Sequence, residues 1–179
     1  MIVLFGIAGS GKGTQAEILA KRLNCPIVTT GDILRKNQAN PAVKAATEAG
    51  KLVPDEITLS LLEQELSSIG ADGNEFILDG SPRTLTQAKW LAERIKNGQI
   101  RLTAIIHIKL SKDEALKRLK LRARHDDTEA SIQGRFNFYQ NSVIPALNYM
   151  KAQGYKVIEI DGEQSVESVA AKIDKALGL

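Results

Sequence analysis

The stretch Gly6-Ile-Ala-Gly-Ser-Gly11-Lys12-Gly13-Thr14 decides the fold, because it connects the apolar run Ile2–Phe5 to a helical pattern over Thr14–Leu23. It fits the pattern G-x-x-x-x-G-K, with the hydroxyl residue displaced by one position because Gly13 precedes Thr14. Backbone N–H groups can converge on a polyphosphate only where side chains are absent, and the start of a helix adds positive potential. Lys12 can reach the β and γ phosphates, and a nearby hydroxyl can meet Mg²⁺ or a phosphate oxygen. The stretch therefore predicts a phosphate-binding loop rather than a plain glycine-rich turn.

Short apolar runs alternate with helical patterns along the whole chain. The runs are apolar almost throughout, which is typical of strands buried on both faces of a parallel sheet. Alternation of this kind predicts a doubly wound α/β sheet. Together with the phosphate-binding loop after the first strand, this alternation leads us to expect the P-loop NTPase fold, with a five-stranded parallel sheet flanked by helices. The expected strands are Ile2–Phe5, Pro26–Thr29, Glu75–Leu78, Thr103–Ile108 and Lys156–Ile160. The expected helices are Thr14–Leu23, a cluster over Gly31–Ile69, Leu85–Lys96, Asp113–Arg122, Thr128–Gln153 and Val166–Leu177.

The interval from Gly31 to Asn74 contains more than one helical pattern, although a single crossover helix would connect two parallel strands. We interpret residues 30–59 as a small helical subdomain inserted for a substrate, within a single domain over residues 1–179. Pro145 should kink or split the long helix over Thr128–Gln153, because proline removes a helical N–H donor.

The composition limits the classes of function. The chain has 179 residues and a net charge of +3, with 43% hydrophobic and 25% charged residues, as in globular domains. A single cysteine, Cys25, excludes an internal disulfide and suits a reducing compartment. No run approaches the length of a membrane span, and the apolar start lacks the basic residues of a signal peptide. We therefore expect a cytoplasmic protein that binds no membrane. A monomer is our further expectation, which the composition does not test.

A basic run over Lys117–Arg124 and a sequence pI of about 9.0 raise the alternative of nucleic-acid binding. No aromatic residue accompanies the run, so bases would have no stacking platform, and we expect no nucleic-acid partner. The two histidines form no ligand set. His107 should be packed in a strand, and His125 should lie at the surface.

The run Glu75–Gly80 ends in Asp79, a carboxylate that a parallel sheet would deliver to the phosphate site. Such an aspartate typically holds Mg²⁺, directly or through water. Asp79 is therefore the expected magnesium residue, and magnesium the expected cofactor.

Several motifs occur in one order: Gly9-Ser-Gly-Lys-Gly-Thr-Gln15, Thr30-Gly-Asp-Ile-Leu-Arg35, Ala49-Gly-Lys-Leu-Val53 and Leu78-Asp-Gly-Ser-Pro-Arg83-Thr84. Together with Arg124, the pair Asp126-Asp127 and Arg135, they resemble the adenylate kinases among the nucleoside monophosphate kinases. The resemblance covers almost the whole chain. It implies reversible transfer of the γ-phosphoryl group of MgATP to AMP, giving two ADP.

The resemblance also implies roles for individual residues. The donor ATP would be bound by Gly9, Ser10, Gly11, Lys12, Gly13, Thr14, Arg118 and Gln164. The acceptor AMP would be bound by Thr30, Arg35, Val53, Gly80, Arg83 and Gln87. The groups that act on the transferring phosphoryl would be Lys12, Arg83, Arg122, Arg124 and Arg135.

The chain departs from the family pattern at three places. Ala8 stands where proline is usual, and Ser81 stands where phenylalanine is usual, beside Arg83. The closing lid is reduced to residues 122–126, since only Ala123 separates Arg122 from Arg124.

Because of these departures, two alternative functions stay open. One is a kinase for another monophosphate, such as CMP or UMP. The other is a nucleotide-binding ATPase or regulator with weak transfer.

Overall fold

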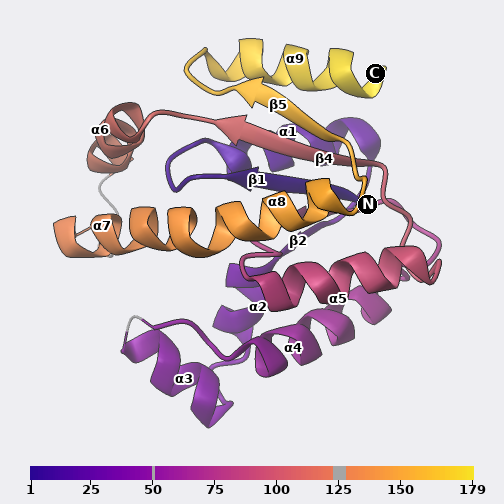
Figure 1. The fold of residues 1–179 in the computed structure, drawn as a ribbon, viewed down its shortest axis with the longest axis vertical. Coiled ribbons are helices and arrows are strands. Elements are labelled where there is room, and N and C mark those ends of the chain that lie inside the picture. The colour runs from indigo at the N-terminus through magenta and orange to yellow at the C-terminus, as the bar shows by residue number, and fades with distance from the viewer. Residues whose placement is uncertain (50, 123–127) are drawn as a thin grey trace.

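The computed structural model describes residues 1–49, 51–122 and 128–179. Its centre is a five-stranded sheet in the order β2-β3-β1-β4-β5, with every neighbouring pair parallel (Figure 1). The predicted α/β class and parallel sheet are therefore confirmed. The strands are β1 (Ile2–Gly6), β2 (Ile27–Thr29), β3 (Ile77–Asp79), β4 (Ala104–Lys109) and β5 (Val157–Asp161).

The central strand, β1, lies between β3 and β4, although the chain after β1 leads to β2 at the edge of the sheet. The strand order therefore changes direction beside β1, and open α/β sheets bind ligands at the carboxyl ends of their strands at such a point. The loop after β1 is Gly6–Thr14, and β3 ends at Asp79, one residue beyond the predicted end of that strand. The topology thus brings the phosphate loop and the expected magnesium residue to one edge.

Helices cover both faces of the sheet. Successive residues of β1 enter different clusters, with Val3 and Phe5 in one and Ile2 and Leu4 in the other. The first cluster includes residues of α5 and α8, and the second includes residues of α1 and α9. These helices are α1 (Lys12–Leu23), α5 (Leu85–Lys96), α8 (Ile144–Ala152) and α9 (Val166–Leu177). Within the described ranges, none of the helices has the length and apolar character needed to cross a membrane.

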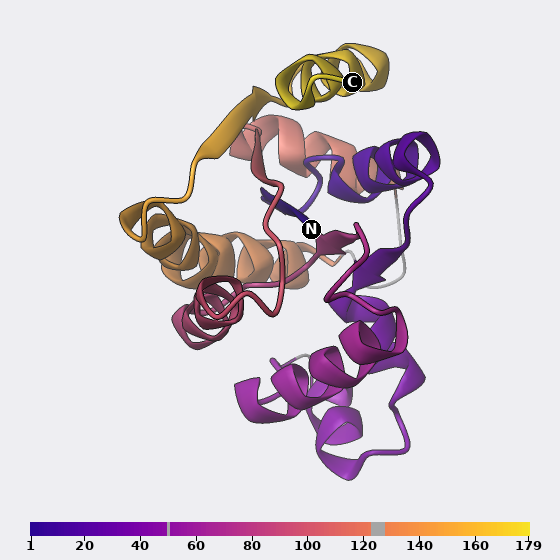
Figure 2. The ribbon, with the colours of Figure 1, turned by 90° about the vertical axis from the view of Figure 1, so that its right-hand side faces the viewer.

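Three helices lie between β2 and β3, in the interval where the sequence predicts an inserted subdomain. They project away from the sheet, as both views show (Figures 1 and 2). Residue 59 lies inside the third of these helices, whose later residues Leu62 and Leu66 are buried in the main core. The three are α2 (Thr30–Lys36), α3 (Pro41–Glu48) and α4 (Asp55–Ser68).

The remaining helices lie near the carboxyl edge: α6 (Lys112–Arg122) and α7 (Glu129–Phe138). The Thr128 side chain caps α7 by accepting from the backbone N–H of Ser131. A π-helical segment, Tyr139–Val143, joins α7 to α8 in one nearly continuous rod (Figure 1). Pro145 is the second residue of α8, after Ile144. The predicted interruption near Pro145 therefore takes the form of a change in helix type.

His107 is packed inside the structure, as predicted. It lies on β4 with 6% of its surface exposed, and its Nε2 is 2.6 Å from the hydroxyl oxygen of Tyr139 in the π-helical segment. Its Nδ1 is buried and has no hydrogen-bond partner within the described part of the chain. Burial lowers the pKa of His107 from 6.5 to about 4, so the ring is neutral at pH 7. The hydrogen bond between His107 and Tyr139 links the π-helical segment to β4.

His107 predicts an acid sensitivity of the fold. Between pH 6.5 and about 4, the unfolded chain binds a proton on this ring and the folded chain does not, so the free energy of unfolding falls as the pH falls. The free energy of unfolding should fall by up to about 3 kcal/mol in total, and this loss is nearly complete at pH 4. Urea unfolding at pH 7.0, 5.5 and 4.5 measures it.

His107→Gln should flatten the pH dependence, because the amide does not titrate. The matched control is His125→Gln, at the chain's only other histidine. Equal pH slopes for wild type and His107→Gln would contradict the assignment.

Candidate active site

Two hollows adjoin each other at the carboxyl edge of the sheet, with volumes of about 650 and 360 Å³. The larger contains the phosphate loop and Asp79, and the smaller contains Arg135 and Tyr139. Both are lined by a shared set of residues: Ala8, Lys12, Gly31, Arg35, Gly80, Arg83 and Arg122. Four of the shared side chains are cationic, so the boundary between the hollows is a place for multiply charged anions.

The phosphate loop needs glycine for steric reasons. Gly9 and Gly11 have φ angles of +87° and +86°, in the left-handed region that favours glycine. A Cβ atom on Gly9 would lie 2.9 Å from the carbonyl oxygen of Ala115 on α6. Gly11 is the N-cap residue of α1 and supplies no side chain to cap it. The first N–H groups of α1, from Lys12 to Thr14, have no acceptor within the helix, and these three residues line the larger hollow.

Lys12 is held by the loop itself. Its ammonium donates to the carbonyl oxygens of Gly6 at 2.8 Å and Ile7 at 3.0 Å, and lies 3.5 Å from the hydroxyl of Ser10. The surrounding protein atoms lower the pKa of Lys12 to about 8, and the carboxylate of Asp79 opposes this change. The position of this charge is therefore set before any ligand binds.

Two arginine guanidinium groups lie close over glycines, where a side chain would have to displace them. A Cβ on Gly80 would lie 2.9 Å from the guanidinium of Arg83, and one on Gly31 would lie 3.3 Å from that of Arg35. Arg35 also forms an ion pair with Asp32 at 2.5 Å, one helical turn away. This pair is exposed to solvent, so its net stabilisation is small, about 0–1 kcal/mol. A phosphate can therefore replace Asp32 as the partner of Arg35.

The residues at the sheet edge fit a magnesium ion. Asp79 ends β3, and both Asp79 and Thr14 line the larger hollow. Carboxylate and hydroxyl oxygens are suitable ligands, and Mg²⁺ typically takes one or two protein oxygens with waters and substrate phosphates. Within the described ranges, no group of three acidic, histidine or cysteine residues forms a closed metal cage. The donor set therefore suits an ion that arrives with a nucleotide.

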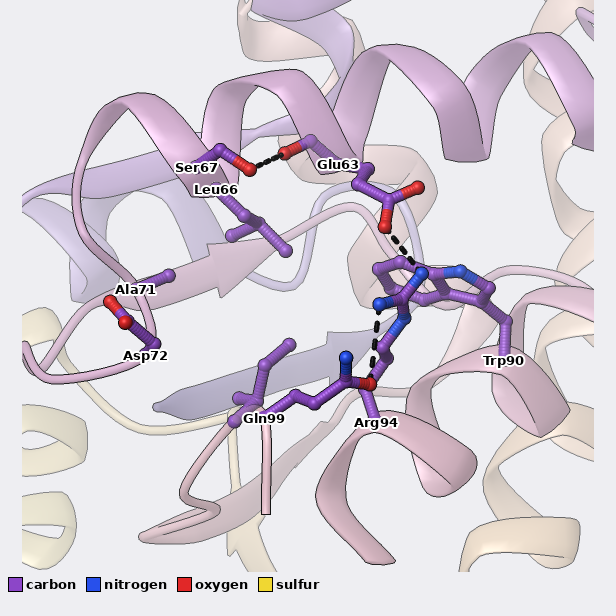
Figure 3. A pocket seen from close by; sticks show the side chains of 9 residues that line it. Glu63, Leu66, Ser67, Ala71, Asp72, Trp90, Arg94 and Gln99 are labelled. Atoms are coloured by element: carbon purple, nitrogen blue, oxygen red, sulfur yellow. Dashed lines mark hydrogen bonds and ion pairs between the residues drawn. The ribbon is translucent and has the colours of Figure 1, made fainter. Parts of the chain in front are cut away.

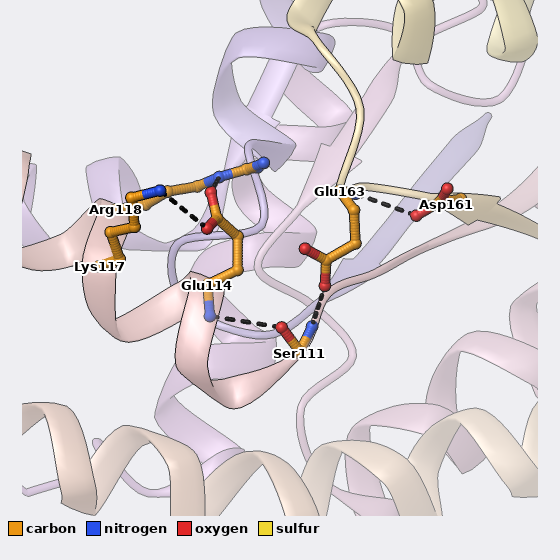
Figure 4. Close-up of polar contacts among 6 residues, drawn as sticks. All are labelled: Ser111, Glu114, Lys117, Arg118, Asp161 and Glu163. Atoms are coloured by element: carbon orange, nitrogen blue, oxygen red, sulfur yellow. Dashed lines mark hydrogen bonds and ion pairs between the residues drawn. The ribbon is translucent and has the colours of Figure 1, made fainter.

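Arginines of α6 and α7 line the same two hollows. Arg118 and Arg122 line the larger hollow, and Arg122 and Arg135 line the smaller one. Arg118 donates from Nε to Glu114 at 2.8 Å, and Glu114 also pairs with Lys117 (Figure 4). Arg124 and the neighbouring residues 123–127 lie outside the described residues.

The loop after β5 is tied to the start of α6. The carboxylate of Glu163 accepts from the backbone N–H of Ser111 at 2.9 Å (Figure 4). The adjacent Gln164 donates from its side chain to Asp161 at 3.1 Å and does not line either hollow. Its predicted contact with the donor base would use a backbone carbonyl, and this role stays a prediction.

Three predicted acceptor residues are buried and line neither hollow. Thr30 is 4% exposed, and its hydroxyl has no partner within the described part of the chain. The carbonyl oxygen of Val53 accepts from Thr58 at 3.4 Å. The amide of Gln87 is bound by Asp55, Ser81 and the backbone N–H of Arg83. Contacts of these residues with a base stay predictions.

A third hollow, of about 310 Å³, lies between α4 and α5 (Figure 3). Arg94 stacks over the ring of Trp90 at 5.1 Å, forms an ion pair with Glu63 and donates to Gln99. No residue of the phosphate loop lines this hollow. It is therefore separate from the candidate active site.

Sequence reasoning missed the side chains that position the predicted residues. Asp55 accepts from both Gln87 and Thr84, and Glu114 holds Arg118. Asp55 is 32 residues from Gln87 in sequence. Because such a pairing depends on tertiary structure, no local pattern could reveal it, whereas Glu114 and Arg118 are at helical i, i+4 spacing.

Comparisons with known proteins agree with this geometry. A family model described as adenylate kinase matches residues 4–155. An adenylate kinase of Corynebacterium urealyticum is 39% identical over 174 residues, covering 94% of each chain. An adenylate kinase of Mycolicibacterium vanbaalenii is 40% identical over 182 residues, covering 99% of this chain and 98% of its own. An adenylate kinase 1 of a Nostoc species is 36% identical over the same coverage.

The alignment with the Mycolicibacterium protein spans 182 positions against a chain of 179 residues. This leaves room for only a few inserted residues, so that relative carries no long lid segment that this chain lacks. The match extends through the phosphate loop, Asp79, Arg83 and the arginines of α6 and α7. The chain therefore belongs to the adenylate kinase family.

Proposed function

We propose that this protein catalyses the reversible transfer of the γ-phosphoryl group from MgATP to AMP, giving two ADP. The observation that carries the proposal is the boundary between the two hollows, where both are lined by Lys12, Arg35, Arg83 and Arg122. A donor in one hollow and an acceptor in the other would bring their phosphates together among these four cations. Membership of the adenylate kinase family supports this arrangement.

In this proposal the phosphate loop holds the donor. The N–H groups from Gly9 to Thr14 and the ammonium of Lys12 bind the β and γ phosphates. Arg118 packs over the adenine, and the backbone carbonyl of Gln164 meets its edge. Asp79 and Thr14 would hold Mg²⁺, which offsets negative charge on the phosphates when it is bound.

The acceptor AMP lies on the other side of the boundary. Arg35 and Arg83 bind its phosphate, while Thr30, the backbone of Val53, Gly80 and Gln87 surround its base. An oxygen of the AMP phosphate forms a bond to the γ-phosphorus as the bond from that phosphorus to the bridging oxygen of ATP breaks, leaving ADP on both sides. Arg122, Arg124 and Arg135 stabilise the charge that spreads over the transferring group.

Phosphoryl transfer needs alignment and charge stabilisation more than acid–base chemistry. A regulator that only binds ATP would not need Arg35 and Arg83 beside the second hollow. A pyrimidine monophosphate kinase is less well supported, because the family relatives are named adenylate kinases. We propose further that the protein acts as a cytoplasmic monomer on small-molecule substrates, with neither a membrane nor a nucleic acid as partner.

The acceptor profile tests the proposed function. With saturating MgATP, AMP should give the highest kcat/KM among AMP, CMP and UMP, and two ADP should form per ATP consumed. A parallel reaction that contains MgATP and no monophosphate measures phosphate release by hydrolysis of ATP.

Because only a short stretch, residues 122–126, stands where a lid would exclude water, we expect slow but measurable hydrolysis of ATP. Hydrolysis as fast as transfer, or a preference for a pyrimidine nucleotide, would overturn the proposal.

Lys12 provides the second test. Lys12→Ala should lower turnover by about 10²–10³ or more, because the ammonium stabilises charge that grows in the transition state. Circular dichroism and the melting temperature should match wild type, since the hydrogen bonds that this side chain makes to described residues all go to its own loop. Lys21→Ala, at an exposed position of the same helix, is the matched control.

The pKa of Lys12 adds a prediction of pH dependence. In the free enzyme the ammonium loses its proton above about pH 8, so kcat/KM for ATP should fall as the pH rises through 8. A profile of kcat/KM between pH 6.5 and 9.5 measures this. A flat profile through pH 8 would show that the charge on Lys12 does not limit ATP capture.

A further inference from the structure

The amide of Gln87 is held on three sides by groups whose hydrogen-bonding capacity is fixed. Its Nε2 donates to Asp55 at 2.8 Å. Its Oε1 accepts from the backbone N–H of Arg83 at 2.8 Å and from the hydroxyl of Ser81 at 3.2 Å. An ionised carboxylate only accepts, and a backbone N–H only donates. Rotating the amide by 180° would set oxygen against oxygen at Asp55 and nitrogen against N–H at Arg83.

These contacts leave one hydrogen-bonding position of the Gln87 amide unused. The two lone pairs of Oε1 are both occupied, and one of the two N–H bonds of Nε2 points to Asp55. The second N–H has no acceptor within the described part of the chain. Gln87 is 5% exposed, so the unsatisfied donor is buried beside the loop that carries Arg83.

Asp55 is itself held in place by a second bond. Its other carboxylate oxygen accepts from the hydroxyl of Thr84 at 2.7 Å, and Thr84 caps α5 by accepting from the N–H of Gln87. Asp55 is the first residue of α4 in the inserted helices, whereas Gln87 and Thr84 belong to the start of α5. The carboxylate therefore joins the two parts of the chain that would enclose the acceptor base.

We propose that Asp55 is a specificity-determining positioning residue, which holds Gln87 so that it can only donate to the acceptor base. This inference rests on the proposed function, because it requires the base to meet Gln87. A ring nitrogen with a lone pair, as in adenine or cytosine, accepts that N–H. A ring N–H at the same place, as in hypoxanthine or uracil, meets another donor and is rejected.

Ser81 strengthens this selection in the present chain. The family pattern has phenylalanine at this position, which could not donate to Gln87. The buried hydroxyl of Ser81 occupies the second lone pair of Oε1, so that the amide oxygen is not available to a base. Ser81→Ala should therefore weaken the rejection of ring N–H bases, while Asp55 still holds the amide.

The test compares pairs of nucleotides that differ in whether the ring nitrogen of the base carries a hydrogen. Wild type should favour AMP over IMP, and CMP over UMP, by about tenfold or more in kcat/KM, since an unmade buried hydrogen bond has a cost of that order. Asp55→Asn removes one of the two groups that fix the amide, since the Asn side chain can donate as well as accept, and leaves only the backbone N–H of Arg83 to oppose a rotation. Both ratios should therefore fall by up to about tenfold, with most of the change in KM. Glu56→Gln removes the same charge from the neighbouring exposed position and should leave both ratios within twofold.

Each outcome has a separate meaning. A purely structural role for Asp55 would lower kcat/KM for both members of a pair by the same factor, and unchanged ratios in Asp55→Asn would overturn the inference. If that variant does not fold, the wild-type ratios still decide, because equal use of AMP and IMP and of CMP and UMP contradicts a donor-only Gln87. Wild type that phosphorylates no monophosphate would refute the proposed function instead.

Discussion

The ammonium of Lys12 is bound by the carbonyl oxygens of Gly6 and Ile7, where the central strand of the sheet ends. This contact sets a positive charge at the point where the strand order changes direction, and it requires the loop to turn tightly around the side chain. The left-handed conformations of Gly9 and Gly11 make that turn possible. Most of the site is arranged around this charge: Asp79 on β3, Arg83 after it, and the arginines of α6 and α7 line the same two hollows.

The cations around Lys12 repel one another unless anions separate them. Arg35 is paired with Asp32, and Arg118 is paired with Glu114. Asp32 lines the larger hollow, and both ion pairs are formed by exposed or half-buried side chains that can exchange partners. In the proposed function, a phosphate of the acceptor would replace Asp32 beside Arg35, and the fold holds the cations in position before the substrates arrive. The third hollow, around Trp90 and Arg94, takes no part in this charge balance.

The fold was largely predictable because its signals are local. Apolar runs marked all five strands, and four of them extend one residue beyond the predicted end, so that Asp79 and Asp161 belong to β3 and β5. The phosphate loop was predictable for the same reason, since its glycines and lysine are consecutive. The polar network around Gln87 was not, because Asp55 and Gln87 meet only when α4 packs near α5. The bond between His107 and Tyr139 is another long-range contact, and the π-helical turn that supplies Tyr139 has no sequence pattern of its own.

The central claim is that two nucleotides bind side by side, with their phosphates meeting at the boundary between the two hollows. A single molecule in which two adenosines are joined through five phosphates tests this directly, because it would have to occupy both hollows at once. Titration calorimetry should show one such molecule bound per chain, and a saturated protein should bind neither ATP nor AMP. Two molecules bound per chain, or AMP binding that persists after saturation, would contradict the account.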